Sequence, residues 1–225
     1  MAHRPLRTRQ ACARLWLAGA ALTLIAQFAS PRAWAESAFD DFDPLTVRVY
    51  DLGGVDAARL AEALVEAQVI FADAGIPSAW HDCTRGVKAP SLACVEDRRA
   101  SDLIVRILRR PPDTRGTLPT ALGVSVVEAG PRAGTLATVF LDLVEPVARR
   151  SGTDVHTLLG RAMAHEIGHL LLGTSGHSAS GLMRETWTDR ELGRNHERDW
   201  LFGPAERGLL REARLRVARQ AQASE

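Results

Sequence analysis

The chain carries almost no net charge, and its basic residues include a single lysine, Lys88. It holds 28 basic and 27 acidic residues, for a formal charge of +1. Five of the basic residues, all arginines, lie within residues 1–35, so residues 36–225 carry 23 basic against 27 acidic residues, a balance of −4. A mildly acidic chain gives no support for nucleic-acid binding, and no nucleic-acid partner is expected.

Long apolar runs are absent except for one near the start of the chain. Arginines at positions 4, 7, 9 and 14 precede an apolar run over residues 15–29, and Ala33-Trp34-Ala35 follows it. This pattern is typical of a secretory signal peptide over residues 1–35, with cleavage before Glu36. The run is short for a membrane span, so no stable membrane anchor is expected after cleavage. Residues 36–225 then form one domain that is secreted or periplasmic.

Cysteine is scarce, and its positions restrict its use. Of the three cysteines, Cys12 lies within the predicted signal peptide, which leaves Cys83 and Cys94 in the exported chain. Two remaining cysteines in an exported protein predict a disulfide, which closes a short loop and stabilises the fold by about 2–3 kcal/mol. A role for these thiols as zinc ligands is the weaker interpretation.

A histidine pair is the most informative feature of the chain. His165 and His169 are four residues apart in the segment 165–169 (HEIGH), so on a helix they share one face. They are separated by a rise of roughly 6 Å, which lets two imidazoles converge on a single metal ion. Glu166 follows the first histidine, where its carboxylate can approach a water at the metal without binding the metal itself. This arrangement is typical of zinc hydrolases, which leave one coordination position open.

The residues around this pair predict a helix that ends in a turn. Residues 154–172 are amphipathic, with either Thr153 or Asp154 as the N-cap. The apolar positions of this segment are Val155, Leu158, Leu159, Ala162, Met163, Ile167, Leu170 and Leu171. Gly173 can end the helix in a left-handed conformation, after which the chain turns back and brings His177 under the metal. Three neutral imidazoles would form an open catalytic site.

The segment 165–183 (HEIGHLLLGTSGHSASGLM) resembles the metzincin zinc peptidases, and within them the matrixin-like branch. In that family one helix carries two histidine ligands and the catalytic glutamate, a glycine turn leads to a third histidine, and a Met-turn places a methionine beneath the zinc. The resemblance implies three histidine ligands for one Zn²⁺ ion, a glutamate base, a turn glycine and a Met-turn methionine. In this sequence these residues are His165, His169, His177, Glu166, Gly173 and Met183.

The spacing of this segment differs from the usual family pattern. Three residues instead of two separate His169 from Gly173, and three instead of two separate Gly173 from His177. We therefore expect a slightly longer helix and a wider turn. No tyrosine follows Met183, which excludes a tyrosine ligand of the astacin type; the single tyrosine is Tyr50.

A gluzincin-type peptidase is the competing interpretation of the histidine pair. In that scheme a glutamate on a downstream helix is the third ligand, and Glu191 or Glu197 stands at a suitable place in the sequence. The scheme leaves His177 and Met183 without a role, which favours the metzincin-like interpretation.

The order of predicted elements fits an α+β, zincin-like fold with a mixed, mostly parallel sheet. Strands are expected at 45–50, 78–82, 102–108, 121–127 and 137–144, and helices at 56–74, 154–172 and 204–220. The family resemblance implies that the strand at 121–127 is an antiparallel edge strand, which a substrate joins as an added strand. An active-site helix, a Met-turn and a C-terminal helix complete the expected fold.

These residues predict a secreted or periplasmic zinc-dependent endopeptidase that acts on a peptide or protein substrate. Glu166 would take the proton of the attacking water and pass it to the leaving amine. Two alternatives stay open: a non-proteolytic zincin-fold protein that binds zinc or a partner, and a zinc hydrolase acting on another amide, such as a cell-wall peptide. Glu166 favours an enzyme, because a binding module has no chemical need for a carboxylate at that position.

Overall fold

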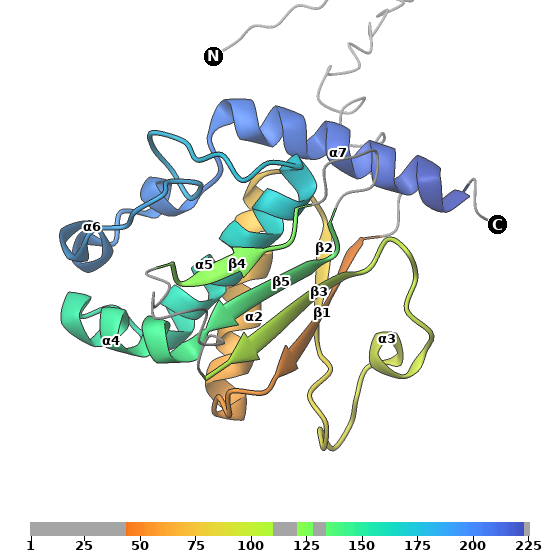
Figure 1. Cartoon of the computed structure of the whole chain (residues 1–225), viewed down its shortest axis with the longest axis horizontal. Helices are drawn as coiled ribbons and strands as arrows, with labels where there is room; N and C mark the ends of the chain where they lie inside the picture. The colour runs from red at the N-terminus through yellow and green to blue at the C-terminus, as the bar shows by residue number, and fades with distance from the viewer. Residues whose placement is uncertain (1–43, 110–120, 128–133, 223–225) are drawn as a thin grey trace, which may run out of the picture. The chain divides into compact units, whose positions relative to one another are not determined.

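The computed structural model of the chain describes residues 44–109, 121–127 and 134–222. The predicted signal peptide, residues 1–35, lies outside them. At the centre is a five-stranded sheet with the strand order β2-β1-β3-β5-β4. Its strands are β1 (Leu45–Asp51), β2 (Ser78–Asp82), β3 (Leu103–Leu108), β4 (Gly123–Ser125) and β5 (Leu136–Phe140). Four strands are parallel, and β4 pairs antiparallel with β5 at one edge (Figure 1).

Two long helices, α2 (Ala57–Asp73) and α5 (Val155–Leu172), pack against each other on one face of the sheet (Figure 1). Alternate residues of the strands point at these helices; in β3 these are Leu103, Val105 and Ile107, all buried. The side chains of α2, α5 and this face of the sheet form one continuous apolar core. α5 therefore runs along the middle of the domain, with its first-turn and last-turn residues nearest to solvent.

The remaining helices surround this core. They are α3 (Leu92–Val95), α4 (Leu141–Ser151), α6 (Asp189–Arg194), the 3₁₀ helix η1 (Glu197–Trp200) and α7 (Pro204–Gln222). α7 packs against α5 and α4 packs against both α5 and α6. None of the helices in the described segments is both long enough and apolar enough to cross a lipid bilayer.

The predicted α+β class and the mostly parallel sheet with an antiparallel edge strand are confirmed. The predicted strand 137–144 is wrong beyond Phe140, because β5 ends there and α4 begins. From Leu141 the buried positions are Leu141, Val144 and Ala148, so the apolar period changes from two residues to that of a helix. A continuous apolar run does not show this change, which explains the error. The edge strand is also shorter than the predicted 121–127.

A buried arginine fixes α5 against its neighbours. Arg161 is only 5% exposed, and its Nε atom donates to Glu66 on α2 at 3.0 Å. Its guanidinium lies 4.3 Å from the centre of the Trp200 ring, and its Nη2 atom donates to Asn195 at 2.6 Å. Burial lowers the pKa of Arg161, while the ion pair with Glu66 opposes that change. These contacts join α5 to α2 and to the segment before α7, so α5 is held from two sides.

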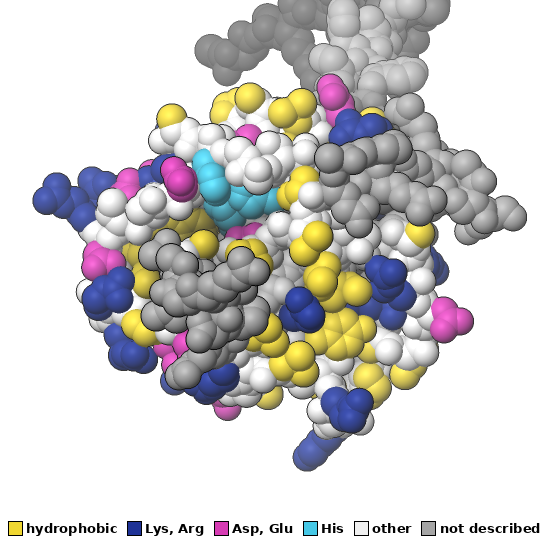
Figure 2. Space-filling model, viewed as in Figure 1, with side chains coloured by type: hydrophobic (Ala, Val, Ile, Leu, Met, Phe, Trp, Pro, Cys, Tyr) yellow, Lys and Arg dark blue, Asp and Glu magenta, His cyan; other side chains and the backbone are white. Residues whose placement is uncertain are grey.

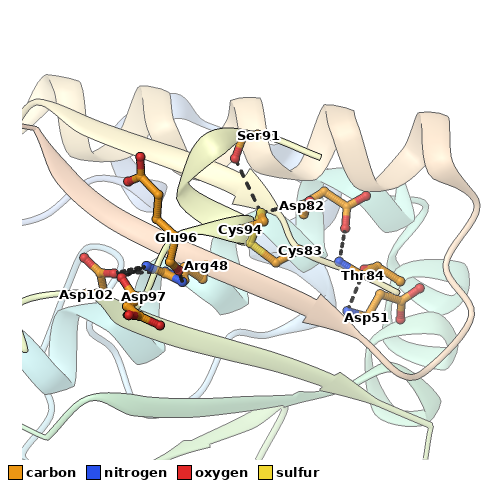
Figure 3. The surroundings of a disulfide bond; sticks show 10 residues. All are labelled: Arg48, Asp51, Asp82, Cys83, Thr84, Ser91, Cys94, Glu96, Asp97 and Asp102. Atoms are coloured by element: carbon orange, nitrogen blue, oxygen red, sulfur yellow. Dashed lines mark hydrogen bonds and ion pairs between the residues drawn. A yellow bond between two sulfur atoms is a disulfide. The ribbon is translucent and has the colours of Figure 1, made fainter. Parts of the chain in front are cut away.

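The expected disulfide between Cys83 and Cys94 is present, and it joins the end of β2 to α3 (Figure 3). Beside it, the guanidinium of Arg48 on β1 forms a buried ion pair with Asp102 at 2.7 Å. The same guanidinium donates to the backbone oxygens of Glu96 and Asp97, at 3.0 Å each. Arg48 thus holds the segment that follows the disulfide loop against the sheet.

Candidate metal centre

α5 presents His165 and His169 on one face, and both rings are fixed by backbone carbonyl groups. The Nδ1 atom of His165 lies 2.9 Å from the oxygen of Leu182, and the Nδ1 atom of His169 lies 2.8 Å from the oxygen of Thr174. A carbonyl oxygen only accepts, so each Nδ1 atom carries the hydrogen and each Nε2 atom of the neutral ring carries a lone pair. Backbone partners of this kind orient the histidine ligands of metal sites.

The two free Nε2 atoms face each other at 3.0 Å. With both hydrogens on Nδ1, this contact is no hydrogen bond but a pair of facing lone pairs, which repel unless a cation lies between them. Two nitrogen ligands of a tetrahedral zinc ion, each 2.0–2.1 Å from the metal, stand about 3.3 Å apart. The histidines of α5 therefore fit a metal ion.

Burial keeps these two rings neutral, as metal ligation requires. His165 is 8% exposed and His169 is 6% exposed. Desolvation lowers the pKa of His165 to about 4, although the hydrogen bond to Leu182 opposes it. The pKa of His169 is also lowered, again chiefly by burial. Both imidazoles are thus unprotonated at neutral pH and available to a metal.

His177 joins this pair from the loop that follows α5. Gly173 caps the helix in a left-handed conformation, with φ of 66°, and the chain reverses. The potential ligand atoms of His165, His169 and His177 all lie within 4.8 Å of one another, and His177 is exposed. The wider spacing on both sides of Gly173 therefore still brings His177 to the cluster.

The carboxylate of Glu166 is buried next to the three histidines. Glu166 is 6% exposed, and desolvation raises its pKa to about 7, partly opposed by a hydrogen bond from Ser125. It lines the same cavity as all three histidines, a space of about 580 Å³. Histidine side chains gather at this place on the surface (Figure 2). The residue can therefore exchange protons with a molecule that enters the cavity.

Met183 packs against α5 at Gly168, where the helix has no side chain. It is 1% exposed, and a Cβ atom on Gly168 would stand 2.8 Å from its sulfur. The turn before it contains Gly181, with φ of 78°. The next residue of the loop, Leu182, supplies the carbonyl that His165 binds. The turn thus carries both a packing contact and a hydrogen-bond acceptor for the metal-site helix.

The two glutamates of the gluzincin-type alternative are engaged elsewhere or exposed. Glu191 forms a capping box with Thr188 at the start of α6 and a short ion pair with Arg184. Hydrogen bonds from Thr188 lower the pKa of Glu191 to about 2. Glu197 is exposed on η1. Within the described segments, the group of residues that could hold a metal is the histidine triad, without a carboxylate.

Sequence reasoning missed the residues that support the triad. The indole of Trp187 lies edge-on to the His165 ring, with ring centres 5.5 Å apart, and its Nε1 atom donates to the Leu182 oxygen at 3.3 Å. Ser178 donates to Glu206 on α7 through a short hydrogen bond. The ring contact between Trp187 and His165 and the Ser178–Glu206 hydrogen bond have no spacing signal, because each joins residues that are distant in the sequence and meet only in the folded chain.

No family model matches the chain, and no curated protein matches it. Among solved structures, it is similar to a zinc-dependent peptidase from Methanocorpusculum labreanum, with a TM-score of 0.49 and 13% identity over 73% of this chain and 99% of that one. It is also similar to archaemetzincin from Methanopyrus kandleri, with a TM-score of 0.49 and 16% identity over 76% of this chain and 95% of that one. At this level of similarity neither structure carries an argument about activity, which depends on the site itself.

Proposed function

We propose that the chain is a zinc-dependent endopeptidase of the metzincin type, in which His165, His169 and His177 hold one zinc ion. The observation that carries this proposal is the pair of Nε2 atoms 3.0 Å apart, each with its lone pair free, beside a buried glutamate. A structural zinc site is closed by four protein ligands, whereas three histidines leave a position open to a substrate. The matrixin-like branch, suggested by residues 165–183, is part of the same proposal.

The chemistry divides between the metal and the chain. A zinc ion held by the triad would act as a Lewis acid that polarises a carbonyl and lowers the pKa of water from about 16 toward ~7. Glu166 accepts the proton of the attacking water and then donates it to the leaving amine. Burial raises its pKa to about 7 in the metal-free protein, so the carboxyl group takes and releases a proton readily.

We also infer that the protein acts outside the cytoplasm, in the periplasm or the medium. The basic, apolar and small-residue pattern of residues 1–35 supports export, and the Cys83–Cys94 disulfide is of the kind that persists in an oxidising compartment. N-terminal sequencing of the protein purified from the exported fraction tests this inference. A chain that still begins at Met1, found with the cytoplasmic proteins, would contradict it.

The change Glu166→Gln tests the activity, because it keeps the size of the side chain and removes its basicity. We expect kcat/KM on a peptide library to fall by about 10²–10⁴-fold, the usual loss for a general base. Zinc content, measured by elemental analysis, should stay at one ion per chain, since Glu166 is not a ligand. Glu62→Gln is the matched control, because this carboxylate lies on α2 and pairs with His156.

The outcomes separate the enzyme from its alternatives. A chelator should abolish cleavage by the wild type, and added zinc should restore it. Equal cleavage by the wild type and the Glu166→Gln variant would assign the activity to another site. Zinc binding with no cleavage of any peptide would favour the non-proteolytic binding protein, and cleavage of cell-wall peptides alone would narrow the substrate class.

A further inference from the structure

The edge strand β4 holds the carboxylate of Glu166 from two sides. The hydroxyl of Ser125 lies 2.5 Å from the Oε2 atom of Glu166 and 2.7 Å from the backbone oxygen of the same residue. A Cβ atom on Gly123 would lie 2.7 Å from Cγ of Glu166 and 2.8 Å from Oε1. Both strand residues therefore touch the reacting side chain directly, although the sequence motif on α5 contains neither.

We propose that Ser125 and Gly123 are positioning residues that fix the carboxylate of Glu166 in the orientation needed for proton transfer. This inference rests on the proposed peptidase function. It assigns to β4 a task separate from any pairing with a substrate strand: the strand is a clamp on the base.

Ser125 restricts the glutamate by joining two of its parts. Its hydroxyl lies within hydrogen-bond distance of both the carboxylate and the backbone carbonyl of Glu166, and its single hydrogen is shared between these two acceptors. A free glutamate side chain has several rotatable bonds, and ordering it costs conformational entropy. Oε2 accepts this hydrogen bond in the ionised carboxylate, and it still accepts when Oε1 carries a proton. The contact is therefore compatible with both forms that the base takes during turnover.

Gly123 lies on the other side of the carboxylate. Its φ lies outside the left-handed region, so its backbone conformation does not require glycine, and the close approach of Glu166 is the reason why a side chain is excluded here. The nearest three atoms to an added Cβ all belong to Glu166. Within the described segments Oε1 makes no hydrogen bond, and both Gly123 and Glu166 line the cavity. Oε1 is thus the carboxylate oxygen left free for a proton.

β4 is fixed by its pairing with β5, so Gly123 and Ser125 hold defined positions beside Glu166. Gly123 pairs with Val139 and Ser125 pairs with Ala137 on β5, so both residues lie on the same face, toward α5. Backbone hydrogen bonds extend the pairing on either side, from Val126 to the Leu136 oxygen at 3.0 Å and from Phe140 to the Leu122 oxygen at 2.8 Å. The clamp is therefore part of the sheet.

Kinetics of three variants test the proposal. Ser125→Ala and Gly123→Ala should each lower kcat by on the order of 10–10²-fold, the effect of a misplaced catalytic group. KM should change by less than about 2-fold, because the contact positions the base and not the substrate. Ser125→Thr keeps the hydroxyl and should restore most of the rate. Ser151→Ala is the control: it removes a hydroxyl that also binds helix carbonyls, at the end of α4.

Double variants give a second and independent measurement. In the Glu166→Gln background, Ser125→Ala should cause little further loss of the residual rate, because residues that act as a unit are not additive. In the metal-free protein, the shift in unfolding midpoint caused by Ser125→Ala should shrink when Glu166 is replaced by alanine. Additive shifts would mean that the two side chains do not interact.

The possible failures are distinct. An active wild type whose Ser125→Ala variant keeps the same kcat overturns the clamp and leaves the peptidase function standing. A loss of rate that appears in KM alone, or that Ser125→Thr does not restore, also contradicts positioning of the base. A wild type that binds zinc and cleaves no peptide overturns the peptidase function, and the clamp with it.

Discussion

His165 and His169 are buried on α5, whereas His177 is exposed on the loop after Gly173. The helix half of the site is oriented by the carbonyls of Thr174 and Leu182, and the ring of His177 makes no hydrogen bond with any described residue. The helix half is thus preformed, with its lone pairs already facing each other. The loop half supplies an exposed ring that is placed only by packing against the other two histidines, with ring centres 5.5 Å from His165 and 4.9 Å from His169.

The loop half is nonetheless anchored through the residue next to His177. The backbone nitrogen of Ser178 donates to the Met183 oxygen at 2.8 Å, and its hydroxyl donates to Glu206 at the start of α7. The other oxygen of Glu206 accepts from the backbone of Gly203 at 2.5 Å. The His177 ring therefore makes no hydrogen bond with a described residue, although the backbone beside it is held by two.

The comparison between the helix half and the loop half of the site is tested most directly by the variants His165→Ala and His177→Ala. Each should weaken zinc binding by more than the roughly 10–100-fold that loss of a ligand's hydrogen-bond partner costs. Without metal the two variants should differ in stability. His177→Ala should change the free energy of unfolding by less than about 0.5 kcal/mol, since the ring is exposed. His165→Ala should cost about 1–3 kcal/mol, because it leaves a cavity and removes a partner of the Leu182 carbonyl. Zinc titration and denaturant unfolding give both quantities.

Undiminished zinc in the His177→Ala protein would contradict the assignment of the third ligand and return Glu191 and Glu197 to consideration. Equal destabilisation of the metal-free protein by both changes would remove the distinction between the two halves.

The buried base should make the metal-free protein less stable at high pH. The pKa of Glu166 in the folded protein, about 7, lies above its usual value of 4.5, so between these values the folded state keeps a proton that the unfolded state has lost. Its contribution is full below pH 4.5 and is lost as the pH rises through 7. The free energy of unfolding of the Glu166→Gln protein should therefore equal that of the wild type near pH 4 and exceed it by on the order of 3 kcal/mol at pH 8. Chemical unfolding at both values, with chelator present, measures this difference.

His165 acts with the opposite sign in the same experiment. Its pKa in the folded protein, about 4, lies below the usual value of 6.5, so its contribution to stability is full above pH 6.5 and is lost as the pH falls through 4. The difference between the wild type and Glu166→Gln removes this background, because both proteins contain His165. A difference that does not grow with pH would mean that the carboxylate is better solvated than its burial indicates.

Two glycines test how tightly each half is packed. Gly168→Ala would place a Cβ 2.8 Å from the Met183 sulfur and 2.9 Å from the Phe202 ring. Overpacking costs about 1–3 kcal/mol, and the gain in helix propensity returns about 1, so we expect a net loss of about 1 kcal/mol and weaker zinc binding. Gly176→Ala meets only the Thr174 hydroxyl at 3.2 Å, and should stay within about 0.5 kcal/mol. Equal effects from both would show that the helix half has room to relax.

The smallest expected effect concerns the anchor of the loop. Ser178→Ala removes the hydroxyl that Glu206 accepts, and should destabilise the protein by about 0.5–1 kcal/mol. Zinc affinity should fall by less than about 10-fold, because the ligand itself is intact and only its neighbour has lost a partner. Thermal unfolding measures the loss of stability, and competition with a zinc chelator measures the loss of zinc affinity. A loss of zinc as large as that of His177→Ala would show that the loop has no other support.

The parts of the fold that the sequence predicted are those with a strong local period. α2 and α5, the strands β1, β2 and β3, and the histidine pair all follow from spacing within one element. The boundary between β5 and α4 was predicted wrongly, because an apolar run can serve a strand or a buried helix, and only contacts with α5 and α6 decide between them.

The supporting contacts of the site could not be predicted from the sequence. The acceptors for His165 and His169 are backbone carbonyls, which every residue possesses. The clamp residues Gly123 and Ser125 lie some 40 residues before Glu166 and meet it only because β4 joins the sheet beside α5. The histidines and Glu166 can be recognised in the sequence by the type of their side chains. The residues that orient them can be recognised only by their position in the fold.

The hydrogen bond between Ser178 and Glu206 also bears on the order in which the chain folds. The helical hydrogen bonds of α5, which place its two histidines on one face, join residues only four apart in the sequence. The loop that carries His177 is fastened to a helix that begins almost thirty residues later, at Pro204. Until α7 has docked, this anchor of the third ligand is missing. The loop beside the third ligand thus gains one of its two anchors only when the C-terminal helix is in place.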